Sequence, residues 1–141
     1  MNRRVGVLLL AMLLGLAASA RASAMVYHLA IKNDTDIAQS ISFQEMQCMH
    51  IASHSGGYDI GPHQVWNGTM VTVMSGTNSD GQSCSSNAVA SSFWLVLDRG
   101  VGGAVQAAKR TMEPWRVVNM KRGRFHIVGA PGLVLHLTIV Q

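Results

Sequence analysis

Apolar and polar residues alternate with a period of two through most of the chain beyond residue 25. The clearest apolar sets are Tyr27, Leu29 and Ile31, then Phe93, Leu95 and Leu97, and finally Leu133, Leu135, Leu137 and Ile139. Because successive side chains of a strand point to opposite sides of a sheet, each set would cover one face of a strand. Stretches rich in Gly, Ser, Asn and Asp separate the alternating segments, as in antiparallel sheets. The pattern predicts an all-β domain.

The alternation changes phase in the second expected strand. Ile41 and Phe43 share a face, but the next apolar residues are Met46 and Cys48. A shift of this kind indicates a bulge or the end of a strand. After a polar loop at residues 53–62, three valines are expected to share a face of the next strand: Val65, Val71 and Val73.

The last third of the chain completes the expected fold. Trp115–Met120 and Phe125–Val128 read as two strands of a hairpin, joined by the tight basic turn Lys121–Arg124. One helix is expected at Gly100–Met112, where apolar residues recur at helical spacing: Ala104, Ala107, Ala108 and Met112. The whole pattern predicts an antiparallel two-sheet β-sandwich of six to eight strands with one short helix. A small closed β-barrel is the alternative.

The N-terminal segment has the composition of a secretory signal peptide. Two arginines precede an apolar run at residues 5–18, and small residues before Met25 offer A-x-A cleavage sites. The apolar run is shorter than the roughly 20 residues that a membrane-spanning helix needs. We therefore expect residues 1–24 to be a signal peptide and residues 25–141 to form a single domain. The mature protein would act in the periplasm or be secreted.

Much of the positive charge of the chain lies in that leader. Three of the eleven Lys and Arg residues are Arg3, Arg4 and Arg21, so eight cations and seven acids remain after residue 24. A net charge of +1 gives no reason to expect a nucleic-acid partner. The remaining charges are unevenly placed along the chain. Six of the seven acids precede Arg99, whereas seven of the eight cations are Arg99 or follow it.

The two cysteines, Cys48 and Cys84, are expected to form a disulfide. An exported protein matures in an oxidising compartment, where a single pair of cysteines most simply forms one bond. Cys84 lies in a long loop of small polar residues, 75–87, which would be flexible without that bond. Closing the loop between the cysteines would stabilise the fold by about 3–4 kcal/mol.

The sequence contains no convincing catalytic or cofactor-binding motif. The six histidines show neither HxH nor HExxH spacing, and there is no G-x-S-x-G. The expected disulfide would also remove both thiols as nucleophiles. The segment Asp98–Gly103 has two of the three glycines of a dinucleotide loop and lacks the βαβ context. We therefore expect neither a cofactor nor an enzymatic activity.

A cluster of soft side chains around Cys48 is the candidate metal site. Met46, Met49, His50 and His54 would suit copper, above all if Cys48 were a thiolate. In a disulfide Cys48 is not available, and the other four are then scattered over both faces of a strand. Methionine is also a common core residue. These residues are therefore weak candidates, and a periplasmic copper- or metal-binding protein is the second alternative function.

The densest group of cations is the best candidate for a binding surface. Lys121, Arg122 and Arg124 would meet at the basic turn, with Trp115 and Arg116 on the strand before it. Several cations on one surface attract an acidic protein face or an anionic membrane. The alternative interpretation is a solvated turn that blunts the edge of a sheet.

Together these features favour an exported, non-enzymatic binding protein. Polar loops on a rigid scaffold often carry recognition. The first hypothesis is therefore a protein that binds or inhibits a protein partner, as inhibitors and immunity proteins do. The sequence does not indicate an oligomeric state.

The alternative function is a membrane- or glycan-binding secreted β-sandwich with cytolytic activity. A strand, the turn Asn33–Thr35, a second strand, and then Ile60-Gly61-Pro62 before Trp66 follow one another in this chain. This order is similar to the layout of small secreted cytolysin-type sandwiches. The similarity covers less than half of the chain and consists of common residue types.

Overall fold

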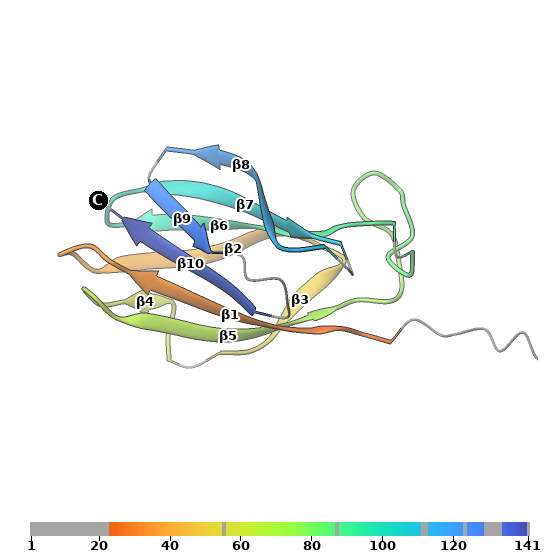
Figure 1. Cartoon of the computed structure of the whole chain (residues 1–141), viewed down its shortest axis with the longest axis horizontal. Helices are drawn as coiled ribbons and strands as arrows, with labels where there is room; N and C mark the ends of the chain where they lie inside the picture. The colour runs from red at the N-terminus through yellow and green to blue at the C-terminus, as the bar shows by residue number, and fades with distance from the viewer. Residues whose placement is uncertain are drawn as a thin grey trace, which may run out of the picture.

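The computed structural model describes residues 23–54, 56–86, 88–110, 113–122, 124–128 and 134–140. These residues form β-strands and no helix, so no helix among the described residues could cross a membrane (Figure 1). The strands are β1 (Val26–Asn33), β2 (Gln39–Gln47), β3 (Met49–His54), β4 (Asp59–Ile60), β5 (Val65–Thr72), β6 (Ser91–Arg99), β7 (Gly103–Lys109), β8 (Arg116–Lys121), β9 (Arg124–Val128) and β10 (Val134–Val140).

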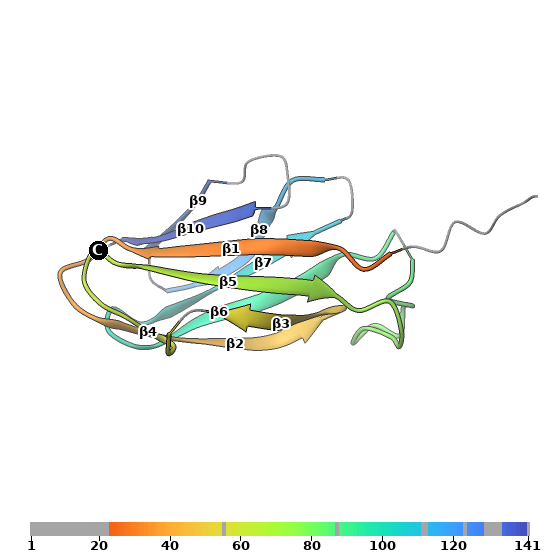
Figure 2. The same cartoon turned by 90° about the horizontal axis from the view of Figure 1, so that it is seen from below.

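The strands form two five-stranded sheets. Sheet A has the order β3-β5-β1-β10-β9, and sheet B has the order β4-β2-β6-β7-β8. Neighbouring strands are antiparallel except for β1 and β10, which run parallel with Leu29 opposite Leu135 and Ile31 opposite Leu137. Figure 2 shows β1 and β10 side by side within their sheet. Neither sheet closes on itself, so the predicted β-sandwich is confirmed and the barrel alternative is wrong.

Alternating side chains from both sheets form one hydrophobic core. The three clearest apolar sets of the alternation, in β1, β6 and β10, face inward wherever the structure describes them, and Ile31, Phe93 and Leu135 are fully buried. Burying one such side chain stabilises the fold by about 1.5–3 kcal/mol. The core therefore supplies the rigid support on which both outer faces of the sandwich are built.

The expected phase of β5 is wrong. Trp66 and Met70 face the core, whereas Val65 is exposed and Val71 is only partly buried. A shift of one residue along a strand moves every side chain to the other face. The register that turns Trp66 and Met70 inward buries more apolar area than the one that would bury the valines.

The helix predicted within Gly100–Met112 is also wrong, because residues 103–109 form β7. This strand pairs along its whole length with β6, from Ser91 opposite Lys109 to Leu97 opposite Gly103. Alanines at helical spacing are compatible with a strand as well, and Val105 and Ala107 also alternate. Pairing with a buried neighbouring strand overrides the weak local preference for a helix.

The hairpin expected around Lys121–Arg124 is replaced by a crossing between sheets. β8 pairs with β7 in sheet B, whereas β9 pairs with β10 in sheet A. The turn therefore carries the chain from one sheet to the other at the side of the sandwich, where Figure 1 shows β8 and β9. β8 and β9 are therefore consecutive in the sequence but do not pair, because each is an edge strand of a different sheet.

Three of the ten strands are not among those expected from the sequence: β7, which replaces the expected helix, and the short strands β3 and β4. β3 follows directly on β2, where the sequence indicates a bulge or a strand end. Glu45 and Cys48 have positive φ there, and the pairing of β2 with β6 shifts register between Gln44 and Gln47. β4 lies within the expected polar loop. Both strands carry too few apolar residues to show an alternation of their own.

A buried polar network closes the end of the sandwich at the β1–β2 turn. The side-chain amide of Asn33 donates to three backbone carbonyl oxygens, those of Ile37, Ile60 and Gly61. The Gln39 amide donates to Thr35 Oγ1 at 2.9 Å, and its oxygen accepts from the Val101 N–H at 3.1 Å. Because the buried polar groups have partners, the network rigidifies this end.

Candidate functional site

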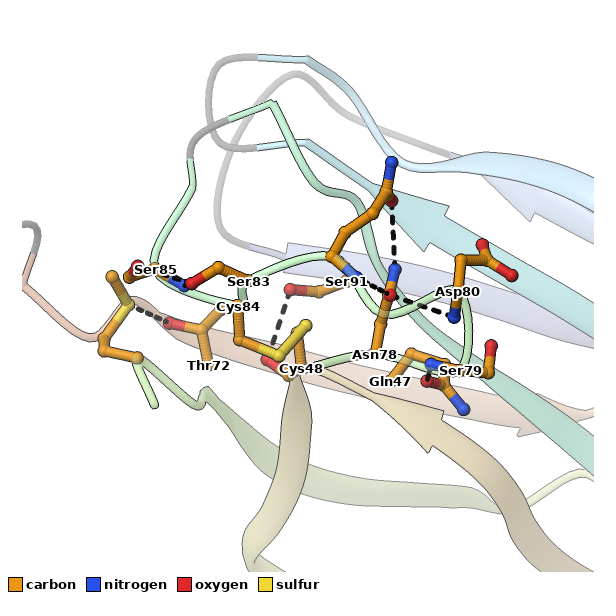
Figure 3. The surroundings of a disulfide bond; sticks show 12 residues. Gln47, Cys48, Thr72, Asn78, Ser79, Asp80, Ser83, Cys84, Ser85 and Ser91 are labelled. Atoms are coloured by element: carbon orange, nitrogen blue, oxygen red, sulfur yellow. Dashed lines mark hydrogen bonds between the residues drawn. A yellow bond between two sulfur atoms is a disulfide. The ribbon is translucent and has the colours of Figure 1, made fainter. Parts of the chain in front are cut away.

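The predicted disulfide between Cys48 and Cys84 is present. The two Cα atoms are 5.2 Å apart, and the bond joins the β2–β3 junction to the long loop between β5 and β6 (Figure 3). Ser91 Oγ donates to the carbonyl oxygen of Cys48 at 3.3 Å, which ties the same junction to the start of β6. The loop is thereby fastened covalently to the sheets beneath it.

Side-chain hydrogen bonds hold the same loop in one shape. Gln47 Oε1 on β2 accepts from the backbone N–H of Ser79 at 2.8 Å. Asn78 Oδ1 accepts from the backbone N–H groups of Asp80 at 3.0 Å and Gln82 at 2.8 Å, a local turn that asparagine favours. Figure 3 shows Gln47, Asn78, Ser79 and Asp80 together beside the disulfide.

A polar hollow of about 330 Å³ lies between this loop and the outer face of sheet B. Its lining combines small side chains with amide and charged ones. The small ones are Ala88, Ala90, Ser92 and Ala108, and the polar ones include Glu45, Gln47, Asn78, Asp80, Gln82, Gln106, Arg110 and Arg116. A concave surface with converging polar groups is the usual form of a recognition site.

Strand register explains why the surface is hollow there. Gln47 on β2 is opposite Ser92 on β6, which is opposite Ala108 on β7, which is opposite Arg116 on β8. The two long residues, Gln47 and Arg116, stand at the ends of this row with their backbones about 14 Å apart across three strand spacings, and the small residues lie between them. In the adjacent row Trp94 replaces the small residue of β6, so the surface rises again.

The two sides of the hollow carry opposite charges. Glu45 on β2 and Asp80 on the loop stand on one side, whereas Arg116 on β8 and Arg110 after β7 stand on the other. Arg110 lies 3.7 Å from Glu113 in an exposed pair, whereas none of the other three forms an ion pair with a described residue. Charges of opposite sign on facing sides favour a ligand that carries both signs.

The described side chains among the five residues predicted to form the basic binding surface lie in different surroundings. Lys121 extends over the ring of Trp94, with its Nζ 4.7 Å from the ring centroid. Arg122 is exposed in the turn. Arg124 is opposite Val140, and its side chain lies outside the described residues. Only Arg116 lines the hollow.

Trp115 belongs to the core instead. It is 4% exposed and packs edge-on against Tyr27 and Phe93, with centroid distances of 5.5 and 5.7 Å. A ring this deeply buried offers almost no surface to a partner. Its role is therefore to support β8 from beneath.

The weak candidates for metal binding point to different places. Met49 is buried in the core, and His54 stacks with Trp66 at a centroid distance of 5.8 Å. Met46 and His50 line a second, largely apolar hollow of about 360 Å³ between β2 and β3. Among the described residues, no three His, Cys, Asp or Glu side chains form a group that could hold a metal ion.

The buried cation Lys109 has a structural role near the hollow. Its ammonium group donates to the carbonyl oxygen of Glu113 and lies over the ring of Tyr27. Burial lowers the pKa of Lys109 and raises the pKa of Tyr27. Since Glu113 also pairs with Arg110, the buried lysine helps to hold the basic side of the hollow in place.

No protein-family model and no curated protein sequence matches this chain. The function must therefore be inferred from the side chains of the hollow. No sequence motif singles out the polar residues of its lining, such as Glu45, Gln47, Asp80 and Arg110. The available signal was the pair of cysteines, because it indicates that the polar loop is fastened to the fold.

Proposed function

We propose that this protein is an exported, non-enzymatic binding protein whose partner is another protein, as for an inhibitor or an immunity protein. The observation that carries the proposal is the hollow of sheet B, with opposite charges on its two sides and a covalently fastened loop as one wall. A preorganised surface loses little conformational entropy when a partner binds. The recognition surface is thus built before the partner arrives.

The charges of the hollow define the complementary partner surface. Such a surface presents a cation to Glu45 and Asp80 and an anion to Arg110 and Arg116. The side chains of a folded protein readily supply both signs on one surface. Complementary charges of this kind increase the association rate and exclude partners of the wrong polarity.

The disulfide supports the proposed location. A disulfide persists in the periplasm or outside the cell and is rare in a reducing cytosol. Here the bond fastens a wall of the hollow, so the recognition surface would depend on the oxidising compartment.

Quantitative capture from periplasmic and culture extracts tests the function. The wild type, Arg110→Glu/Arg116→Glu and the control Lys32→Glu are immobilised in equal amounts. Lys32 is an exposed cation of β1 in the other sheet. We expect the same protein to be retained by the wild type and the control, and at least about tenfold less by the double variant. A partner retained equally by all three baits would show that the hollow is not its binding site.

A glycan is the second candidate ligand, favoured by the amides of Gln47, Asn78, Gln82 and Gln106 in the lining. Amide groups both donate and accept hydrogen bonds, as hydroxyl-rich ligands require. Amide chemical shifts recorded with neutral oligosaccharides test this possibility. Saturable shifts at these four residues, together with no protein captured from the extracts, would favour the glycan over the protein partner.

A further inference from the structure

β8 is an edge strand with an exposed apolar stretch. All six of its residues are exposed, and Val117, Val118 and Met120 expose 41%, 55% and 43% of their surface. Within the described part of the chain, β8 is paired with β7 alone, so its other edge has no strand partner. Unpaired main-chain groups beside apolar side chains are a template for the addition of another strand.

Cations flank this apolar stretch at both ends. Arg116 begins β8, Lys121 ends it, and Arg122 follows. If two copies of the chain paired antiparallel about a two-fold axis, Arg116 of one would face Lys121 of the other. Like charges directly opposite each other destabilise a pair of strands. The edge therefore disfavours a second copy and complements a strand with acidic ends.

We propose that β8 binds an extended segment of a partner protein as an added strand of sheet B, and that this segment carries acidic residues on both sides of an apolar stretch. The inference rests on the proposed protein-binding function and specifies the segment of the partner. Arg116 and Val118 also line the hollow, so the added strand lies directly beside the recognition surface.

The length of β8 sets the length of the segment. Arg116 and Lys121 lie opposite Ala108 and Ala104 of β7, which are four residues apart on that strand. Because Val118 is an extra residue at a bulge of β8, this separation corresponds to about 13 Å along the strand. The two carboxylates of the bound segment should therefore be separated by a similar number of residues. Main-chain hydrogen bonds to β8 would supply affinity, and the terminal charges would set the direction and the register.

Two synthetic peptides test the proposal without the natural partner. Each alternates valine and threonine, with a glutamate at both ends in one peptide and a lysine at both ends in the other. Binding is measured by fluorescence anisotropy, and the site is mapped by backbone amide shifts and hydrogen exchange. The proteins are the wild type, Arg116→Glu/Arg122→Glu and the control Lys32→Glu.

We expect the glutamate peptide to bind the wild type and the control at least about tenfold more tightly than the lysine peptide. The amide shifts and the added exchange protection should lie in β8, and the double variant should reverse the preference. Strand addition is wrong if neither peptide binds at about millimolar concentration, if both bind equally, or if the shifts lie elsewhere. Capture that depends on Arg110 and Arg116 would still support the protein-binding function in that case.

Discussion

Gly100 shows how one residue couples the buried polar network to the neighbouring turn. Its φ is +97°, a conformation that strains a residue with a side chain. A methyl group on Gly100 would overlap the side-chain oxygen of Gln39 and lie 2.9 Å from the carbonyl oxygen of Ala38. That Gln39 oxygen accepts from the Val101 N–H, so the network leaves no room at this position.

Gly100→Ala should therefore destabilise the protein by about 2–4 kcal/mol, the sum of backbone strain and overpacking. Gly102→Ala is the matched control, because Gly102 also has positive φ but has open space around it. Its cost should be limited to about 1–2 kcal/mol of backbone strain. Urea unfolding of both variants measures the difference. Equal losses would contradict the overlap with Gln39.

Lys109 gives a prediction about pH. Burial lowers its pKa below the usual 10.5. Between the lowered pKa and 10.5 the unfolded chain binds more protons than the folded one, so the contribution of this group to stability rises with pH in that window. The free energy of unfolding of the wild type relative to Lys109→Met should therefore increase as the pH rises from neutral toward 10.5.

Urea unfolding at several pH values measures this difference. Tyr27, whose pKa is raised by burial, is present in both proteins and acts in the opposite direction above its usual 10.0. The comparison between the two proteins therefore isolates Lys109. A difference that does not change with pH would mean that the lysine is not desolvated in the folded state.

At the scale of the element, the sequence predicts the strands that bury one face. It does not predict strands whose formation depends on pairing with a neighbouring strand. The alternation at Tyr27–Ile31 and Phe93–Leu97 identifies β1 and β6, because apolar residues recur at every second position within each segment. The sequence of β7 is equally compatible with a helix, and only its pairing with β6 makes it a strand. The partner of β8 depends on a crossing between sheets, which local pattern does not encode.

The disulfide is the element-scale feature whose removal is most informative. Cys84→Ser should lower the free energy of unfolding by about 3–4 kcal/mol, because the unfolded chain regains the freedom of the closed loop. The intact mass of the wild type purified without reductant should be two hydrogens lower than that of the reduced chain. Reductant should lower the melting temperature of the wild type but not that of the variant. Ready alkylation of both cysteines without reductant would contradict the bond.

At the scale of the whole molecule, the hollow results from four strands and one loop that meet only in the folded chain. Its row of Gln47, Ser92, Ala108 and Arg116 spans nearly half of the sequence. Sequence reasoning identified Arg116 as a cation and Cys84 as an anchor of the loop, but it could not place them on one face. That placement needs the register of the pairs β2–β6, β6–β7 and β7–β8.

The charges also redistribute in space. In the sequence the acids lie in the first part and the cations in the last, which suggests an acidic side and a basic side. In the structure Glu45 and Asp80 face Arg110 and Arg116 across the hollow. The uneven distribution of acids and cations along the sequence therefore places opposite charges on the two sides of one hollow. The proposed partner would therefore be recognised by local complementarity of charge.

The last prediction concerns how binding to the captured partner depends on these charges. Arg110→Ser/Arg116→Ser should weaken binding while changing the free energy of unfolding by no more than about 1 kcal/mol, since exposed charges contribute little to folding. The wild-type affinity should fall as salt rises to physiological strength, where exposed charges are screened beyond about 8 Å. The double variant should show a flatter dependence on salt, because two of the charges that attract the partner are gone. Titration calorimetry at several salt concentrations measures both slopes, and equal slopes would exclude these two arginines from the interface.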